Sequence, residues 1–493
     1  MKRPLSRLAL AAFAVSGLLL AGCSLAPDLQ PPALSMPETW NAPDGMDASA
    51  GEALSARWWT RFGDPALDRL VDEAFAHNRD LLAALARVEY ARAQLGLSRA
   101  EQFPQLSGQA VAQPTYVNGT LVTSQAPYSA AFSVSWELDL WGKYRNATSA
   151  ARSRLAASQS AWAALRLTLA GQVASAYFQL RSLDLQLATA ERTLQSRQAA
   201  LTINQARYEA GLISELDLTQ AQTVVETART ALFRTRTSIE SAEGSLAALL
   251  GRSPRDILLN RLERGRALED LPAPPVIPAG VPSTLLARRP DLIEAEQNLA
   301  AANADVGVAR AAWLPSISLT GALGVISPQL ADLFRSPLDT HSYGGSAAVP
   351  LIDFGRVRAG VEASQAQLKE QYAAYEQAIL NAFSDVRGAL AAQRESALVV
   401  ASLEQQVRQF RQALHLARLR YDNGYSPYLD VLDAERSLFQ SEMDLATARS
   451  DRLVSVVRVC MALGGGWQEG AGPDSATAPQ PATSVPSAAP QRP

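Results

Sequence analysis

Residues Arg420–Leu438 read RYDNGYSPYLDVLDAERSL, and the earlier residues Arg207–Gln222 read RYEAGLISELDLTQAQ. The two segments align without a gap at an offset of 213 residues (420 − 207). A constant offset over many positions indicates a tandem duplication, and such a repeat decides the architecture of a chain. The identical pairs are Arg207/Arg420, Tyr208/Tyr421, Gly211/Gly424, Leu216/Leu429, Asp217/Asp430 and Ala221/Ala434.

The duplicated segment follows a long proline-free stretch in each half of the chain. These stretches cover residues 143–210 and 356–423, which is 68 residues each. A helix of that length spans about 100 Å, far more than an ordinary globular helix, and predicts a coiled-coil body. Gly211 and Gly424 follow directly and are predicted to end the two helices in tight turns, with return helices at about 215–250 and 428–463.

Polar residues after each glycine predict how the return helices begin. Ser214 and Asp217 have the spacing of a capping box, and Ser426 is predicted to cap a helix whose first residue is Pro427. Asp217 and Asp430 occur in both copies near a helix start, so both are predicted to be capping groups.

Two segments upstream of the long helices have the period of β-strands. Phe132, Val134, Trp136, Leu138 and Leu140 alternate with serine and acidic residues, and Ser316–Thr320 alternates in the same way. A soluble domain could bury such an apolar face against helices. A tilted transmembrane strand has the same length and alternation. Each segment is expected to pair with a second strand in a hairpin, which gives four strands per chain. Four strands cannot close a barrel, so a membrane barrel would be shared between chains.

These patterns predict a mainly α-helical fold with a small β part. The expected order is a first repeat at 56–252, an inter-repeat linker at 253–280 and a second repeat at 281–467. Within the repeats, an initial helix at 66–102 and β-hairpins at 104–141 and 315–355 precede the long helices.

The N-terminus has the pattern of an export signal. Lys2, Arg3 and Arg7 precede an apolar run, and residues 1–22 are predicted to be a lipoprotein signal peptide. Cys23 ends an LAGC sequence and is the predicted lipidation site, although an ordinary signal peptide with a chance cysteine is the alternative. Residues 23–55 are predicted to be an extended linker, and residues 468–493 a disordered tail.

Composition and motifs point away from catalysis. The net charge is −3, which gives no reason to expect nucleic acid as a partner. His77, His341 and His415 stand in unrelated contexts, and no cysteine pair or phosphate-binding glycine loop is present. Cys460 lies in an apolar helical run and is predicted to be a buried free thiol. The sequence therefore predicts neither enzyme activity nor a cofactor or metal.

Several short motifs, in the same order along the chain, carry a resemblance to a known family. The chain resembles the TolC-like outer-membrane channels, in particular the NodT-type lipoprotein branch that serves resistance-nodulation-division efflux pumps. Besides the two duplicated segments, the motifs are Leu20–Cys23, Trp59 with Phe62–Pro65, Ala287–Asp291, Ala301–Arg310 (AANADVGVAR), Leu314–Leu319 and Ala462–Trp467.

The resemblance implies a homotrimer that places 12 strands in one outer-membrane barrel and a helical tunnel across the periplasm. It implies lipid anchoring in the outer membrane of a Gram-negative bacterium, a periplasmic membrane-fusion adaptor and an inner-membrane pump of the resistance-nodulation-division type. It also implies a passive exit duct for drugs or small toxic solutes. By motif, the periplasmic gate would consist of Leu429 as an apolar plug, Asp433 as an acidic ring, and Tyr421 and Arg436 as ties.

Other interpretations remain open. Asp433 and Arg436 are three residues apart and could form an ordinary exposed pair on a helix, worth a few tenths of a kcal/mol. The duct could serve secreted polypeptides instead of solutes, or the protein could be a non-conducting trimeric spacer of the envelope. The sequence identifies neither the substrate nor the particular pump and adaptor.

Overall fold

The computed structural model describes residues 24–30, 32, 35, 55–113, 116–117, 120–121, 127–259, 262–272 and 285–467. The predicted signal peptide, Cys23 and the tail from residue 468 lie outside them. The chain forms two compact units. The first comprises residues 1–34, 86–158 and 293–378, and the second comprises residues 35–85, 159–292 and 379–493. Each unit draws on both halves of the sequence, so the two repeats are not separate compact bodies.

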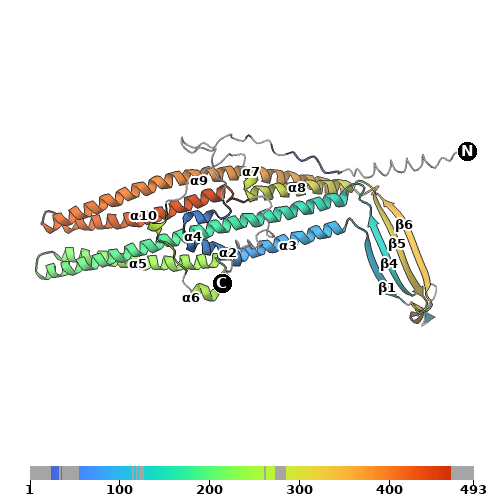
Figure 1. Cartoon of the computed structure of the whole chain (residues 1–493), viewed down its shortest axis with the longest axis horizontal. Helices are drawn as coiled ribbons and strands as arrows, with labels where there is room; N and C mark the ends of the chain where they lie inside the picture. The colour runs from blue at the N-terminus through green and yellow to red at the C-terminus, as the bar shows by residue number, and fades with distance from the viewer. Residues whose placement is uncertain are drawn as a thin grey trace, which may run out of the picture. The chain divides into compact units, whose positions relative to one another are not determined.

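Helices make up most of the described chain (Figure 1), which confirms the predicted fold class. α4 covers residues 143–209 and α9 covers 356–422, within one residue of the predicted long helices. No described helix combines the length and apolar character needed to cross a membrane. The shorter helices are α2 (Pro65–His77), α3 (Arg79–Ala100), α5 (Glu215–Leu249), α6 (Pro254–Leu259), α7 (Leu285–Arg288), α8 (Pro290–Ala311) and α10 (Tyr428–Ala462).

The predicted continuous helix over 66–102 is wrong, because Asn78 divides it into α2 and α3. Asn78 has extended backbone angles. Its side-chain Oδ1 accepts a hydrogen bond from Leu81 N at 3.0 Å and its Nδ2 donates to Leu249 O at 2.8 Å. Asparagine favours such a capping position, and the bond to α5 depends on a contact that hydrophobic periodicity does not reveal.

The first unit contains one antiparallel four-stranded sheet in the order β1–β4–β5–β6. β4 ends at Glu137, so Leu138 and Leu140 lie beyond the strand on which the alternation had placed them. A separate short ribbon pairs β2 (Tyr116–Val117) with β3 (Thr120–Leu121). The strands of the main sheet are β1 (Gln105–Ala112), β4 (Tyr128–Glu137), β5 (Ser316–Ser327) and β6 (Leu338–Ala348).

The register places apolar residues on one face of this sheet. Leu106 pairs with Val134, which in turn faces Gly321 and then Tyr343 across the strands. Phe132 and Leu323 form the next row, and both side chains are 67% exposed. The other face carries rows such as Ser107, Ser133, Ala322 and Ser342. The sheet therefore presents a large apolar face that the helices of the same unit leave uncovered.

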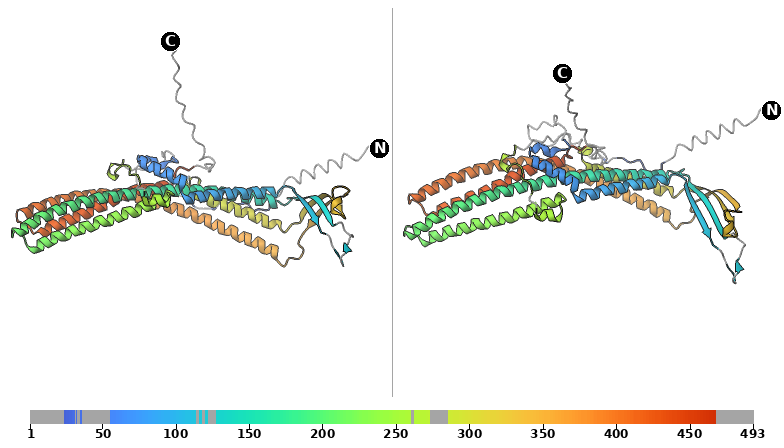
Figure 2. Two further views of the ribbon diagram at one scale, coloured as in Figure 1. Left: turned by 90° about the horizontal axis from the view of Figure 1, so that it is seen from below. Right: turned by 60° about the horizontal axis from the view of Figure 1, so that its bottom comes forward.

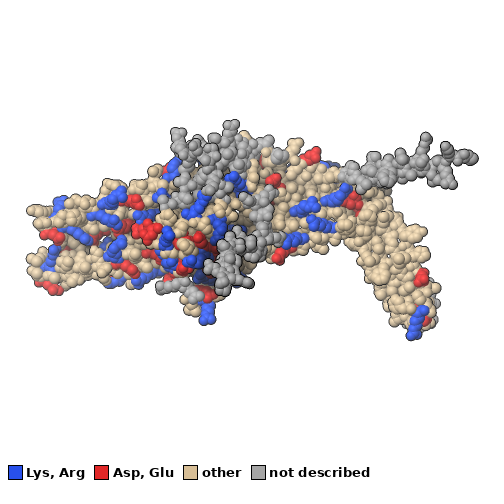
Figure 3. All heavy atoms as spheres, viewed as in Figure 1, with Lys and Arg blue, Asp and Glu red and all other residues tan. Residues whose placement is uncertain are grey.

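Both outer strands of the sheet, β1 and β6, are edge strands. An edge strand carries unpaired backbone donors and acceptors, which soluble proteins normally protect. In the view of Figure 3, the part of the surface formed by the strands is almost free of charged side chains except at its far end. An exposed apolar face next to open edges indicates that the sheet is completed by other material.

The core of the second unit is organised around the aromatic segment at Trp58, Trp59 and Phe62. All three side chains are almost fully buried, and Phe62 packs on Phe178 with ring centroids 4.9 Å apart. Burial of each such side chain contributes about 1.5–3 kcal/mol. This contact joins the start of the first repeat to α4.

Asp64 then caps α2 and binds the inter-repeat linker. Its Oδ1 accepts from Ala66 N, and its Oδ2 accepts from the Tyr177 hydroxyl at 2.5 Å and from Arg266 N at 3.3 Å. The same hydroxyl accepts from Gly265 N at 3.1 Å. The buried carboxylate thus ties together α2, α4 and the linker.

Candidate functional site

The duplicated segments form two matching helix-to-helix turns. Gly211 N donates to Tyr208 O and Gly424 N donates to Tyr421 O, at 2.8 and 2.9 Å. Both glycines have positive φ, 73° and 76°, in the region that other residues avoid. The residue after each glycine closes the turn with a second bond at 2.8 Å, Leu212 N to Arg207 O and Tyr425 N to Arg420 O. The repeat in sequence is a repeat in hydrogen bonding.

The helix starts after the two turns differ. Ser214 and Asp217 form the predicted capping box at α5. The prediction for α10 is wrong, because Pro427 is the cap residue and no side chain caps the helix. Ser426 Oγ has no partner among the described residues. The α5 turn is therefore closed by side-chain bonds that the α10 turn lacks.

The two hairpins, α4–α5 and α9–α10, lie side by side with their turns at the same end (Figures 1 and 2). Arg207 connects the turns, with its guanidinium carbon 5.5 Å from the Tyr421 ring centroid and its Nη2 3.4 Å from Asp422 Oδ1. The Tyr421 ring lies 5.1 Å from that of Tyr428. Tyr428 is buried with Ala221, Val431 and Leu432. Tyr421 therefore sits within a tie between the first and second copies.

The other predicted gate residues lie on the exposed surface of the first turns of α10. Leu429 is half exposed. Arg436 Nη2 donates to Asp433 Oδ1 at 2.9 Å, and the two side chains are 79% and 56% exposed. Within one chain, Asp433 and Arg436 therefore form an ordinary exposed ion pair between residues three apart on a helix. Tyr421, in contrast, contacts Arg207 of the first copy.

A buried ion-pair network, which the sequence analysis missed, lies further along α10. Glu435 accepts a hydrogen bond from Arg418 Nη2 of α9 at 2.7 Å, and Arg197 Nε of α4 lies 3.9 Å from its other oxygen. Arg197 and Glu435 side chains are only 4% and 10% exposed. Arg197 also donates to Val224 O at 3.0 Å. Side chains of three helices therefore meet at the Glu435 carboxylate, and Arg197 also binds the backbone of α5.

A second network of the same design lies two turns along α10. Glu442 accepts from Arg411 Nη2 of α9 at 2.7 Å and lies 3.5 Å from Arg192 Nη2 of α4. Glu435 and Glu442 are seven residues apart, as are Arg411 and Arg418. This coiled-coil spacing was the signal in the sequence that would have found both networks.

Burial changes the electrostatics of this region. It lowers the pKa of Arg197, while the nearby Glu435 carboxylate opposes that change. Burial also raises the pKa of Tyr428. Taking a guanidinium out of water is costly unless a carboxylate accompanies it, so Arg197 requires Glu435.

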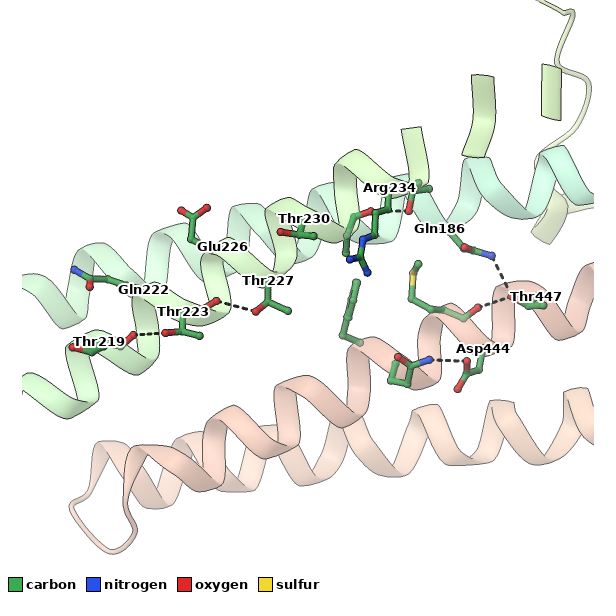
Figure 4. A pocket seen from close by; sticks show the side chains of 15 residues that line it. Gln186, Thr219, Gln222, Thr223, Glu226, Thr227, Thr230, Arg234, Asp444 and Thr447 are labelled. Carbon is green, nitrogen blue, oxygen red and sulfur yellow. Dashed lines mark hydrogen bonds between the residues drawn. The ribbon is translucent and has the colours of Figure 1, made fainter. Parts of the chain in front are cut away.

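A groove of about 870 Å³ separates α5 from α10 (Figure 4). Thr223 and Thr227 line its α5 side and donate to carbonyls four residues earlier, each at 2.9 Å. Phe439 and Met443 contribute apolar surface from α10. Arg234 points into the space between the helices. The groove combines an apolar patch with a rim of hydroxyl, amide and charged groups.

The described residues contain no cluster of three or more His, Cys, Asp or Glu side chains able to hold a metal ion. His77 ends α2, His341 lies on β6 and His415 lies on α9. Cys460 is a buried free cysteine on α10, as predicted. The distinctive features of this region are the two turns, the contacts of Arg207 between them and the groove between α5 and α10.

Comparison with known proteins agrees with this geometry. The sequence profile of the outer membrane efflux proteins matches residues 70–252 and 281–465. The solvent efflux pump outer membrane protein SrpC of Pseudomonas putida is 36% identical over 462 residues, covering 91% of this chain and 97% of that protein. The cation efflux system protein CusC of Escherichia coli K12 is 33% identical over 452 residues, covering 91% and 97%.

Solved structures of channels have the same fold. The CmeC outer membrane channel of Campylobacter jejuni superimposes with a TM-score of 0.83 at 27% identity, covering 91% of this chain and 96% of that one. The open state of the MtrE outer membrane channel of Neisseria gonorrhoeae gives a TM-score of 0.77 at 32% identity, covering 90% and 99%.

Proposed function

Since this chain belongs to the outer membrane efflux protein family, we propose that three copies form one passive duct that is closed at the paired turns. The protein acts in efflux and its location is the outer membrane. The observation that carries the proposal is the sheet of the first unit, with its exposed apolar face and two open edges. Lipid can cover the apolar face, and neighbouring copies can pair with the edges.

The number of strands supports a barrel shared between chains. Small closed barrels have about eight strands, twice the four of this sheet, so its two edges would pair with the edges of other copies. Three copies, the number that the resemblance implies, supply 12 strands. A trimer that survives mild detergent supports the shared barrel, and a monomer under the same conditions contradicts it.

Cys23 would carry the lipid that anchors each copy to the outer membrane. The chain would be exported by the signal peptide at 1–22 and then processed at the LAGC sequence. Mass spectrometry of the purified N-terminal peptide tests this step, since acylation adds the mass of the lipid to Cys23.

The gate would lie at the second-copy turn, with Leu429 as plug, Asp433 as acidic ring, and Tyr421 and Arg436 as ties. A ring of carboxylates in a narrow pore favours cations and repels anions. In one chain Asp433 and Arg436 bind each other and remain exposed, which leaves both available to neighbouring copies. Tyr421 differs, since it holds the second-copy turn to Arg207 of the first.

The energy for transport would come from partners, an inner-membrane pump of the resistance-nodulation-division type joined through a periplasmic adaptor. We assign the adaptor contact to the groove between α5 and α10, because an apolar centre with a polar rim is typical of protein interfaces. A photoreactive amino acid at Thr227 in the groove should cross-link to the adaptor in cells, whereas one at exposed Arg152 of α4 should not.

Single-channel conductance in a planar bilayer tests the duct and its gate. The wild type should show a small, cation-selective conductance, and Asp433→Ala/Arg436→Ala should raise it clearly. Glu226→Ala/Arg229→Ala is the matched control, because that pair has the same spacing on α5 and is also exposed. If the wild type conducts and the tip variant is unchanged, the gate assignment is wrong. If verified trimers never conduct, the protein is a structural spacer.

The cargo follows from the family only as a class. SrpC is named for solvents and CusC for cations, and we propose small toxic solutes or drugs for this chain. A duct for secreted polypeptides is the rival. Deletion of the gene should increase sensitivity to small toxic compounds without changing the set of secreted proteins, and the reverse result favours polypeptide secretion.

A further inference from the structure

The first described residues of the chain, Ser24–Pro27, bind to α4 and α8 of the first unit. We call the site formed there by Asn146, Asn303, Gly307 and Arg310 the seat. Ser24 Oγ donates to Asn146 Oδ1 of α4 at 2.9 Å. Asn146 is only 6% exposed, and its Nδ2 has no partner among the described residues. A buried amide with an unused donor beside this segment indicates a site built for polar ligands and not a chance surface contact.

Two side chains of α8 hold the backbone of the same segment. Asn303 Nδ2 donates to Pro27 O at 2.9 Å, and Arg310 Nη1 donates to Leu25 O at 3.1 Å. Both acceptors are main-chain carbonyls, so these bonds fix the path of the chain whatever the side chains at those two positions are.

Gly307 allows the close approach. A Cβ at this position would lie 2.5 Å from Asn146 Nδ2 and 2.9 Å from Ala26 N, closer than real side chains come. Asn303, Gly307 and Arg310 are separated by four and three residues, so they share one face of α8. All three belong to the AANADVGVAR motif, to which neither the proposed gate nor the proposed barrel assigns a role.

The first repeat provides a natural comparison. GLSRAEQFP at residues 96–104 aligns with GVARAAWLP at 307–315, which makes Gly96 the equivalent of Gly307 and Arg99 the equivalent of Arg310. Among the described residues, nothing lies within 4 Å of a Cβ placed on Gly96. The first repeat retains the glycine and the arginine, but no described segment binds there.

The seat lies beside the ends of the strands. Asn146 is in the first turn of α4, nine residues after β4 ends at Glu137, and α8 ends at Ala311, five residues before β5 begins at Ser316. Ser24 directly follows Cys23, and one residue spans at most about 3.8 Å. A lipid on Cys23 would therefore be tethered next to the ends of α4 and α8 that lead into the sheet.

We propose that Asn146, Asn303, Gly307 and Arg310 form a binding seat for the N-terminal segment of the processed chain, Ser24–Pro27. A lipid attached to Cys23, the residue before Ser24, would then be kept next to α4 and α8 by the covalent chain. The anchoring role rests on the proposed lipidation of Cys23, whereas the seat itself rests on hydrogen bonds between described residues.

A nitroxide spin label on Asp28→Cys, in purified full-length protein in detergent, tests the seat. Asp28 is exposed and directly follows the seated residues. Cys460 is buried and should not react. The label should be immobile in the otherwise wild-type chain. Its rotational correlation time should fall several-fold in Asn303→Ala/Arg310→Ala and in Gly307→Ala.

Gly96→Ala and Arg99→Ala are the matched controls and should leave the label immobile. Circular dichroism of every variant shows whether the helices remain intact, so loss of fold is recognised separately. A label that is already mobile in the wild type, or equally immobile in the seat variants, overturns the proposal.

The same samples separate this inference from the proposed function. Two nitroxides per chain would show that Cys23 is not acylated, which removes the anchoring role but leaves the seat to be judged by mobility. If the labelled protein shows no conductance in the planar bilayer while its label is immobile, the result contradicts the proposed duct but not the seat.

Discussion

Glu435 on α10 lies between Arg197 of α4 and Arg418 of α9, and this carboxylate joins the two duplicated hairpins. Glu435→Ala would leave the Arg197 guanidinium buried without its counter-charge. We expect a loss of about 3–5 kcal/mol in the free energy of unfolding. Thermal unfolding in detergent, followed by circular dichroism, measures it.

Asp433→Ala is the control for this prediction. Asp433 lies two residues before Glu435, but its carboxylate belongs to an exposed ion pair. Its effect should stay within about 1 kcal/mol. Equal effects of the two substitutions would show that Arg197 does not depend on Glu435. In a double-mutant cycle with Arg197→Met, Arg197 and Glu435 should be coupled by about 0.5–3 kcal/mol.

Alanine in place of a turn glycine should lower the stability of the protein, whereas alanine in place of a glycine inside a helix should raise it. Gly211→Ala and Gly424→Ala should each cost about 1–2 kcal/mol, because φ is positive at both while no described residue obstructs the new Cβ. Gly388→Ala, inside α9 with free space around it, should instead stabilise the protein by about 0.5–1 kcal/mol. Chemical unfolding of the three variants decides this, and a common sign would refute the role of backbone conformation.

Tyr177→Phe should loosen the inter-repeat linker. The hydroxyl donates to Asp64 and accepts from Gly265 N, so its removal leaves a buried carboxylate oxygen and a backbone donor under-satisfied. We expect a cost of about 1–3 kcal/mol in unfolding, whereas Tyr90→Phe at an exposed position should have almost no effect. Faster proteolysis within residues 262–272 should accompany the loss.

The same tyrosine predicts a pH dependence. Burial and the hydrogen bond to Asp64 raise the pKa of Tyr177 above its ordinary value. The stabilisation is therefore fully present below about pH 10, where the unfolded chain also keeps its proton, and is lost as the pH rises further. Unfolding midpoints measured across alkaline pH should fall less steeply for Tyr177→Phe, and parallel curves would contradict the assignment.

Cys460 should not react with maleimide in the folded protein. Burial raises the pKa of its thiol to about 12, so almost none of the reactive thiolate exists near neutral pH. After unfolding in denaturant, one thiol per chain should react if Cys23 carries a lipid and two if it does not. Rapid labelling of Cys460 before unfolding would contradict its burial.

The duplication, the two long helices and their ends could be read from the sequence, because all of these depend on local signals. The absence of proline over 143–210 and 356–423 permits an uninterrupted helix, and a glycine at each end supplies the positive φ that stops it. The alternation at Phe132–Trp136 likewise revealed a strand with one apolar face, since side chains on a strand alternate between its faces.

Other features depended on contacts between distant parts of the chain. The break at Asn78 is made by a bond to Leu249, and no periodicity signals it. Arg197, Arg418 and Glu435 meet only because three helices pack together. The seat for Ser24–Pro27 requires α4 and α8 side by side, with a glycine of α8 at the point of contact.

Sequence alone determined which segments are helices, strands and turns, because local sterics and hydrogen bonding set these. Tertiary structure decided which charges are buried together and what each surface holds, because those energies depend on residues far apart in the chain.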